Sequence, residues 1–427
     1  MIARNGYFMT MFAPVRGMKD LYGIPARKYR YIIDTARRIG EKYGYAEIKT
    51  PIVEATEVFH RTIGDETDVV SKEMYSFFDK GGENLTLRPE GTAAVMRAIV
   101  SENLAQSFPV KLMYYGEMFR YDRPQRGRYR QFHQLGFECV GDKSPYTDAI
   151  LICMATEILN AIGIFDTKVL LNTLGDNETR EAYTKGLVKY LSRHEDKLSE
   201  DSKRRLGKNP MRILDSKDSN DREICQMAPL ITDYLSKESE QYFQQLCELL
   251  AKAGVNFEID NFLVRGLDYY GETASEFKST SGEYRDSVGG GGRYDSLLSM
   301  FGGADVSGIG FAFGIERLVL LMDDANFTEI APKIAVIPVS ETENELAFQV
   351  LKSLYDAEIS AEFIHIGTLS KKMKVADRLK CSTAVIIGED EIKNGCFTLK
   401  FMDCEDEKEK IKTVSKSDLI SFLKHIH

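Results

Sequence analysis

The sequence predicts a two-domain protein: a large α+β domain on a mainly antiparallel sheet, followed by a smaller α/β domain. Its 427 residues exceed the usual size of one domain, and 43% hydrophobic with 28% charged residues is typical of a folded chain. Apolar stretches separated by Gly and Pro recur before residue 323. After residue 332, strand and helix patterns alternate instead.

The first domain begins with a helix near 26–43. Ile32, Ala36 and Ile39 recur at helical spacing, and Gly44 stands where a glycine commonly ends a helix. Short apolar stretches then predict the strands of the antiparallel sheet. These lie at 46–50, 85–88, 110–115 and 168–173.

Residues 177–255 differ in composition from their surroundings. They are rich in charged residues and serine and show helical rather than strand patterns, which predicts a helical insertion within the sheet domain. The helices are expected at 178–194, 222–236 and 238–253. Strand signals return over 256–313, and a helix over 314–323 closes a first domain of residues 1–323.

Residues 324–332 are expected to be a linker and residues 333–427 the second domain. Strands are predicted at 334–339, 360–366, 383–388 and 396–402, and helices at 343–356, 370–379 and 416–425. The mixed charges of 403–412 indicate a solvated turn.

The composition excludes several classes of protein. With 56 basic and 65 acidic residues the net charge is −9, so any nucleic acid must be bound by local basic patches. The seven cysteines are odd in number and form no C-x-x-C pair, which indicates neither a zinc ribbon nor a disulfide framework and favours a reducing cytoplasm. Because no apolar run approaches 18 residues, no membrane partner is expected.

The most basic segment is 119–134. Between residues 120 and 130 it holds five arginines and one aspartate, a local charge of +4. Pro124 and Gly127 predict a turn that would project these side chains from a loop. Arginine forks suit phosphate, so a phosphate or RNA contact is one interpretation. A solvated hairpin tip is the alternative.

Two further segments combine charge with glycine. Arg265 and Asp268 lie in a largely apolar stretch beside two tyrosines, where a buried ion pair is the alternative to a catalytic role. The glycines of 289–292 and 308–314 fit neither the P-loop nor the Rossmann pattern. They let backbone approach either a neighbouring strand or a ligand.

Taken together, these segments resemble the histidyl-tRNA synthetase family of class II aminoacyl-tRNA synthetases. Residues 45–57, 113–138 and 308–318 resemble class II motifs 1, 2 and 3, and RGLDYY at 265–270 and GGGGRYDSLL at 289–298 resemble the two segments particular to the histidine enzymes. The resemblance implies a class II antiparallel sheet flanked by helices and a C-terminal α/β anticodon-binding domain. It also implies a homodimer through residues 46–58, unless this stretch packs only within its own core.

The implied reaction is that of a histidine–tRNA ligase. L-histidine and ATP give histidyl-adenylate and pyrophosphate, and histidine then passes to the 3′ end of its tRNA. The resemblance makes Arg120 and Arg265 the catalytic cations, and Mg²⁺ is expected to arrive with ATP rather than in a metal site of the protein. The ATP-binding residues it implies are Arg120, Asp122, Phe132 and Arg317, with Asp122 standing where the family usually has Glu.

The resemblance also implies a histidine pocket and a tRNA contact. The histidine-binding residues would be Glu90, Thr92, Gln134, Glu138, Tyr270 and Tyr294. Glu90 has a second interpretation, as a surface or helix-capping acid, because a helix is expected to open near Thr92. The acceptor end of tRNA would meet Arg123, Gln125, Arg126 and Arg128.

Two other functions compete with this one. The regulatory subunit of ATP phosphoribosyltransferase shares the catalytic fold but typically lacks the anticodon-binding domain and the catalytic arginines. An RNA-binding protein without chemistry would leave Glu90, Gln134 and Glu138 unexplained. In the second domain, an RNA-binding patch is expected on one helix, from Lys371, Lys372, Lys374, Arg378 and Lys380.

Overall fold

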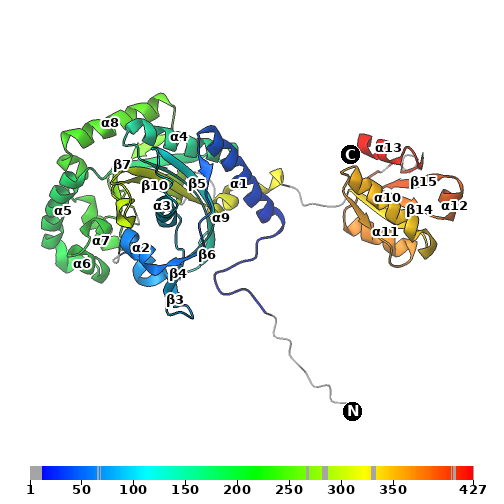
Figure 1. Ribbon diagram of the computed structural model, residues 1–427, viewed down its shortest axis with the longest axis horizontal. Coiled ribbons are helices and arrows are strands. Elements are labelled where there is room, and N and C mark those ends of the chain that lie inside the picture. Colours follow the sequence, from blue (N-terminus) through cyan, green and yellow to red (C-terminus); the bar gives the residue numbers. More distant parts are fainter. Residues whose placement is uncertain are drawn as a thin grey trace, which may run out of the picture. The chain divides into compact units, whose positions relative to one another are not determined.

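The computed structural model describes residues 12–64, 67, 69–265, 269–280, 287–327, 333–404, 406 and 410–426. The chain divides into two compact units, Met1–Phe327 and Thr328–His427 (Figure 1). Within the described parts, no helix is both long and apolar enough to cross a bilayer.

The first unit is built on an eight-stranded sheet of order β1-β5-β6-β11-β10-β9-β7-β8. Its strands are β1 Ala46–Glu47, β5 Val110–Phe119, β6 Gln131–Val140, β7 Thr167–Thr173, β8 Phe257–Ile259, β9 Tyr270–Ser279, β10 Ser287–Tyr294 and β11 Gly308–Gly314. All pairings are antiparallel except the two at the edges, β1 with β5 and β7 with β8. The predicted, mainly antiparallel sheet is therefore confirmed.

The glycines of β10 let its backbone approach its neighbours closely. A Cβ on Gly291 would lie 1.9 Å from the carbonyl oxygen of Gly310, and one on Gly290 would lie 2.4 Å from Nη1 of Arg265. The approach to a neighbouring strand is confirmed at Gly291, and Gly290 makes room for the Arg265 side chain. The approach to a ligand stays a prediction.

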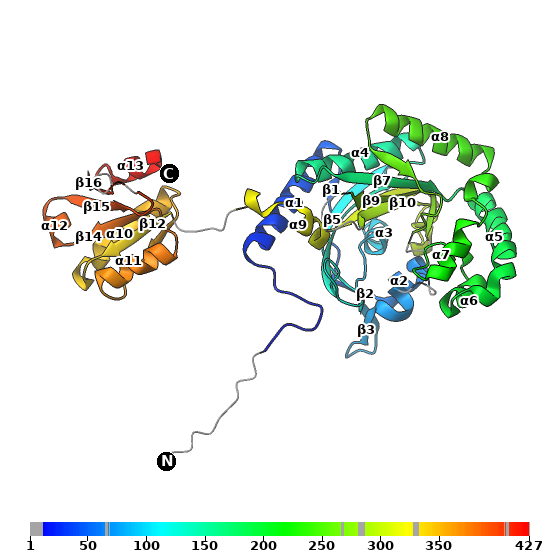
Figure 2. The same cartoon turned by 180° about the vertical axis from the view of Figure 1, so that it is seen from behind.

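Long helices cover one face of this sheet. They are α1 Gly23–Lys42, α4 Pro145–Ala161, α8 Lys237–Lys252 and the short α9 Ile315–Leu321. Their apolar faces join the strands in the largest core, where Ile32, Phe137 and Leu246 are fully buried. Helix α3, Thr92–Ser101, lies inside the curve of the sheet (Figure 2) and packs on a separate core that includes Met96. The helix predicted near 26–43 is confirmed and begins three residues earlier.

A smaller three-stranded sheet of order β2-β4-β3 follows α1 and β1. Its strands are β2 Val53–Ala55, β3 Tyr75–Phe78 and β4 Asn84–Leu87, with α2 Thr56–Ile63 and the π-helical turn Val69–Glu73 beside them.

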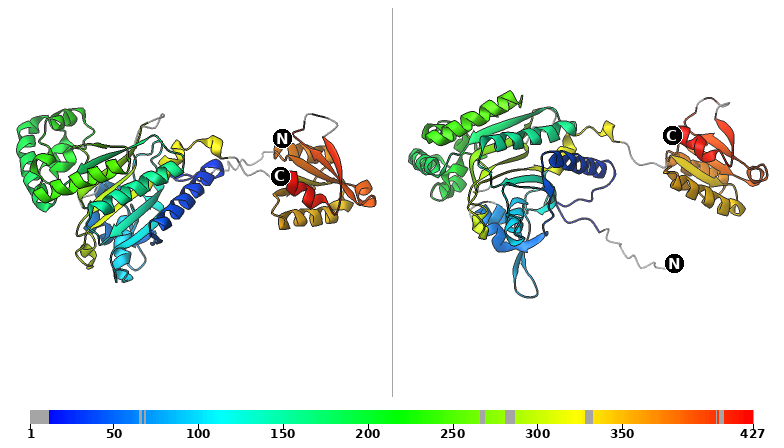
Figure 3. Two further views of the ribbon diagram at one scale, coloured as in Figure 1. Left: turned by 90° about the horizontal axis from the view of Figure 1, so that it is seen from above. Right: turned by 45° about the horizontal axis from the view of Figure 1, so that its top comes forward.

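The insertion between β7 and β8 is helical, as predicted. It holds α5 Asn177–Leu191, α6 Glu200–Leu206 and α7 Ser219–Gln226, which are among the green helices gathered at one end of the sheet in Figure 3, and then α8, which returns over the face of the sheet. Tyr183, Leu187 and Ile213 form its own core. The helix predicted over 222–236 is wrong in extent, because it ends at Gln226 and a 3₁₀ turn covers Ile231–Tyr234.

Residues after α9 still belong to the first unit. The Asp324 carboxylate pairs with the buried Lys28, and the Phe327 ring meets the Tyr31 ring edge-on with centroids 5.6 Å apart. The linker predicted to begin at residue 324 is therefore wrong at its start, because Asp324 and Phe327 both contact α1.

The second unit is a five-stranded sheet of order β13-β12-β14-β15-β16 with helices around it. Its elements are β12 Ile334–Pro338, α10 Asn344–Asp356, β13 Ala361–Phe363, α11 Leu369–Arg378, β14 Thr383–Ile387, α12 Glu389–Lys393, β15 Cys396–Phe401, β16 Ile411–Ser415 and α13 Leu419–Ile426. The turn predicted over 403–412 is wrong at its end, since Ile411 and Lys412 pair with β15. This edge strand buries only Val414 and so lacks an apolar alternation.

One member of the predicted basic patch does not face solvent. Lys372 is 2% exposed, and its Nζ donates to the carbonyl oxygen of Pro338 at 2.7 Å. Its assignment to an RNA-binding surface is wrong, because this side of α11 packs on β12.

Candidate active site

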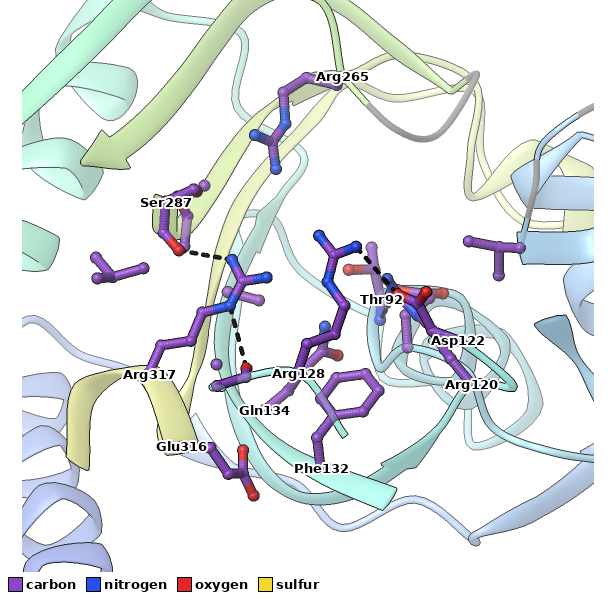
Figure 4. Close-up of a pocket in the computed structure, with 18 of the residues that line it drawn as sticks. Thr92, Arg120, Asp122, Arg128, Phe132, Gln134, Arg265, Ser287, Glu316 and Arg317 are labelled. Atoms are coloured by element: carbon purple, nitrogen blue, oxygen red, sulfur yellow. Dashed lines mark hydrogen bonds and ion pairs between the residues drawn. The ribbon is translucent and has the colours of Figure 1, made fainter. Parts of the chain in front are cut away.

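The first unit holds a cavity of about 360 Å³ between α3, the β5–β6 hairpin and strands β9 to β11. Ten of the predicted site residues line it: Glu90, Thr92, Arg120, Asp122, Arg128, Phe132, Gln134, Arg265, Tyr270 and Arg317. Figure 4 shows eight of them around one open space. Residues from four separate parts of the sequence are therefore brought together around this cavity.

The β5–β6 hairpin supplies one wall. Alternation along β6 turns Phe132 and Gln134 toward the cavity, opposite Met118 and Gly116 of β5. Arg120 follows β5 directly, and its guanidinium lies 5.3 Å from the Phe132 ring centroid. Its Nε donates to the carbonyl oxygen of Pro89 at 2.8 Å, which holds the side chain across the pocket.

The tip of this hairpin divides into two groups of side chains. Arg128 turns inward and pairs with Asp122 at 3.3 Å (Figure 4). Arg123, Gln125 and Arg126 are exposed and do not line the cavity. The tip is thus solvated over part of its length, while Arg128 and Asp122 face the pocket.

Glu90 combines the two roles considered for it. It is 2% exposed, so the surface interpretation is wrong, and it lines the cavity. Its two carboxylate oxygens accept the N–H groups of Thr92 at 2.7 Å and Ala93 at 2.8 Å, which caps α3. Burial raises the pKa of Glu90, and the two N–H donors offset part of that rise.

Glu138 and Tyr294 lie one layer beneath the lining. Glu138 accepts hydrogen bonds from Thr92 Oγ1 at 2.7 Å and from the Tyr294 hydroxyl at 2.6 Å. It is 1% exposed, and burial raises its pKa to about 8. Gly310 makes room for it, because a Cβ there would lie 1.8 Å from Glu138 Oε2. Neither Glu138 nor Tyr294 lines the cavity itself. Thr92 does, and it contacts Glu138, which in turn contacts Tyr294.

Arg317 and Arg265 stand across the pocket from Arg120. Arg317 donates through Nη1 to the carbonyl oxygen of Ser287 at 2.6 Å (Figure 4). Arg265 lies 3.6 Å from Glu276 and 5.5 Å from the Tyr270 ring centroid, and its buried Nε has no hydrogen-bond partner within the described chain. Its possible partner Asp268 lies outside the described residues.

Seven further polar residues line the cavity that the sequence did not assign. They are Glu73, Tyr114, Tyr129, Arg212, Tyr269, Ser287 and Glu316. Tyr114 had an indirect signal in two glycines, since a Cβ on Gly91 or Gly136 would lie 2.1 or 2.3 Å from its ring. Arg212 comes from the helical insertion, and no feature of the sequence indicated that it would line the cavity.

The cavity is rich in positive charge. Its five lining arginines are Arg120, Arg128, Arg212, Arg265 and Arg317, against the acids Glu73, Glu90, Asp122 and Glu316. Asp122 pairs with Arg128, one of these five, and burial disfavours the charged form of Glu90, so the other four arginines outnumber the remaining acids, Glu73 and Glu316. Such a site suits a polyphosphate ligand.

Comparison with known proteins agrees with this geometry. The family described as Histidyl-tRNA synthetase matches residues 17–318, and the family described as Anticodon binding domain matches residues 333–426. Histidine–tRNA ligase of Rhodospirillum rubrum is 44% identical, covering 97% of this chain and 100% of the relative, and that of Gluconacetobacter diazotrophicus is 46% identical over 92% and 95%. The apo histidyl-tRNA synthetase of S. aureus superposes with a TM-score of 0.80 at 33% identity, over 97% of this chain and all of that one.

Proposed function

The chain belongs to the histidyl-tRNA synthetase family, and we propose that the arginine-rich cavity is where it activates histidine with ATP before transfer to tRNA. It has the class II fold with an anticodon-binding domain and acts as a histidine–tRNA ligase. The observation that carries the site assignment is the gathering of five arginines and the buried Glu90 around one cavity, with Glu138 buried behind Thr92.

The arginines serve the phosphoryl chemistry. As the histidine carboxylate attacks the α-phosphorus, negative charge grows on the phosphoryl oxygens, and fixed cations stabilise it. Arg120 and Arg265 take this role, supported by the backbone anchor of Arg120 and the incomplete pairing of Arg265. Phe132 and Arg317 hold the adenine between a ring and a guanidinium plane.

The buried carboxylates serve the amino acid. Glu90, Thr92 and Gln134 receive the ammonium group, since all three line one side of the cavity beside the start of α3. Glu138, Tyr270 and Tyr294 select the imidazole through its two ring nitrogens, with Thr92 linking Glu138 to the cavity.

Mg²⁺ enters as part of the MgATP substrate. Within the described chain, no group of three acidic, His or Cys side chains could hold a metal ion. Of the lining carboxylates, Glu90 caps α3, Asp122 pairs with Arg128 and Glu316 bonds His133. The triphosphate oxygens would therefore supply most of the ligands of the ion.

The tRNA contacts lie in both units. The exposed Arg123, Gln125 and Arg126, with Arg128 behind them, are placed to receive the acceptor end. In the second unit, the exposed cations of α11 and its C-terminal side remain as the basic patch, namely Lys371, Lys374, Arg378 and Lys380.

A homodimer is supported by apolar side chains beside the motif 1 stretch. Ile52 and Val53 at β2 and Phe77 and Phe78 on β3 are 39 to 73% exposed, although they belong to one small sheet. A two-fold pairing would cover them.

We place the enzyme in the cytoplasm. All seven cysteines are free thiols, which a reducing compartment maintains.

The regulatory-subunit alternative is less well supported. The chain retains the arginines that such subunits typically lose, and residues 333–426 match the anticodon-binding family. A histidine-dependent ATP–pyrophosphate exchange assay, followed by charging of tRNA, separates the two functions. The synthetase exchanges label only when histidine is present. A folded protein that binds histidine but exchanges no label would contradict the assignment.

A further inference from the structure

Strand β6 and helix α9 diverge at the edge of the cavity. The ladder between β6 and β11 ends at the pair Gln134 and Gly314, and the chain then turns into α9 at Ile315. Beyond that point no β-ladder bond joins the two segments within the described chain. Their separation must therefore be set by side chains.

Glu316 and His133 make this connection. The two carboxylate oxygens of Glu316 accept the backbone N–H of His133 at 3.1 and 3.0 Å. The Oε1 atom also lies 2.6 Å from Nδ1 of the His133 ring. Because an ionised carboxylate only accepts hydrogen bonds, Nδ1 carries the donated proton. One side chain of α9 thus binds both the backbone and the ring of one residue of β6.

The surroundings hold the His133 ring in place on the face of β6 turned away from the cavity. Its side chain is 17% exposed, and the Tyr29 ring of α1 meets it edge-on at 4.8 Å. Across the strand pair, Glu117 lies 3.8 Å from Nε2, a longer and weaker contact than that of Glu316.

The two sequence neighbours of this link line the cavity. Phe132 precedes His133 and Arg317 follows Glu316, and both line the cavity. In Figure 4, Arg317 and Glu316 extend from α9 in different directions, with Arg317 toward the open space. The link therefore joins, from behind, the two residues proposed to hold the adenine.

We propose that His133 and Glu316 are a positioning pair that sets the spacing between Phe132 and Arg317 and thereby controls the affinity for ATP. This inference rests on the proposed ATP site. The histidine side of the cavity has other anchors, since Gln134 Oε1 accepts the Gly91 N–H at 3.2 Å and Glu138 is held by Thr92 and Tyr294. Loss of the link should affect ATP more than histidine.

Two substitutions at His133 separate this role from simple packing. His133→Asn keeps an N–H donor near the Nδ1 position, whereas His133→Gln carries its amide to the Nε2 position and loses the side-chain bond to Glu316. The backbone N–H of residue 133 still donates to Glu316 in both variants. We expect His133→Gln to raise the Kd for MgATP, by titration calorimetry, and KM for ATP in exchange by about tenfold. His133→Asn should stay within about twofold of wild type, and histidine affinity should change by less than about twofold in both variants.

Glu117→Gln is the matched control, because it removes the other carboxylate near the ring and leaves the link to Glu316 intact. It should bind MgATP as wild type does. The proposal is overturned if His133→Gln binds MgATP normally, if His133→Asn is equally impaired, or if ATP and histidine affinities fall together with the melting temperature. Direct binding also separates failure of the positioning pair from failure of the proposed reaction. If wild-type protein binds MgATP, His133→Gln binds it more weakly, and the wild type exchanges no label, the pair is supported and the proposed reaction is contradicted.

Discussion

Two arginines of the first unit differ in how completely their charge is paired. Arg293 is fully buried and forms an ion pair with the equally buried Asp148, with further bonds to Asp142 and Ser307. Arg265 has one contact of 3.6 Å with Glu276 and a buried Nε without a partner in the described chain. The first arrangement stabilises the fold, whereas the second leaves charge available to a ligand.

We therefore expect Arg265→Ala to fold and to lose exchange activity. Removing a fixed cation from developing charge costs on the order of 3 kcal/mol, or about a hundredfold in rate. Arg293→Ala should instead lower the free energy of unfolding by roughly 3 to 5 kcal/mol, because it strands Asp148. Exchange rates and denaturant unfolding of both variants test this. Normal exchange by folded Arg265→Ala would remove this residue from the catalytic site.

Glu138 gives a second residue-level prediction, for the pH dependence of stability. Its pKa is raised by burial from 4.5 to about 8 in the folded protein. Between these values the folded chain keeps a proton that the unfolded chain has lost, so the free energy of unfolding falls as pH rises through this window. The contribution is fully present below about pH 4.5.

Glu138→Gln removes this titration while keeping the shape of the neutral acid. Relative to wild type, the unfolding free energy of the variant should rise between about pH 5 and about pH 8 by on the order of a few kcal/mol. The melting temperature of the variant should rise relative to wild type over the same range. The exposed Glu102→Gln serves as the control and should follow wild type at every pH. A constant difference between Glu138→Gln and wild type would show that Glu138 is ionised throughout. At fixed pH, kcat/KM should fall more for histidine than for ATP.

At the scale of elements, helix α11 presents two different faces. Lys371, Lys374 and Arg378 are exposed and share one side of the helix at spacings of three and four, whereas Lys372 is buried against β12. The exposed side suits RNA phosphates, and the buried lysine anchors the helix to the sheet.

Changing Lys371, Lys374 and Arg378 together to Gln should weaken tRNA binding and leave histidine-dependent exchange unaltered. The slope of log K against log salt should fall by about 1 for each phosphate that the variant no longer neutralises. Lys372→Met should lower the melting temperature of the second unit, because the Pro338 carbonyl loses its donor. Charging kinetics at several salt concentrations test whether α11 contributes to tRNA binding. Unchanged tRNA affinity of the triple variant would exclude α11 from the interface.

For the whole molecule, the exposed apolar side chains near motif 1 predict association. Sedimentation should give about twice the mass of one 48.3 kDa chain. Phe78→Asp should shift the equilibrium toward single chains, since a charge replaces an apolar contact. Phe165→Asp is a matched control, because both rings are 73% exposed and Phe165 lies in the loop between α4 and β7, outside the small sheet. Equal masses for the two variants at micromolar concentration would contradict pairing through β3.

What the sequence by itself determined were the local features and the family. The period of Ile32, Ala36 and Ile39 predicted α1, short apolar stretches predicted strands, and the quoted motifs identified ten residues that do line one cavity. These features depend on neighbours in the chain, or on residues that the chemistry requires in a set order. Elements with a weak pattern were not predicted. Strand β16 buries a single residue, and helix α6 has only seven residues.

Only the tertiary structure decided which side chains meet. It placed Glu138 behind Thr92, buried Lys372 under β12, brought Arg212 from the insertion into the cavity and joined Glu316 to His133 across 183 positions of sequence. Spacing along the chain gives the face of a helix or strand but not what covers that face. Burial, and with it the pKa of Glu138 and the charge left on Arg265, is set by segments far away in the chain, so it follows from the packing of the sheet and not from any local pattern.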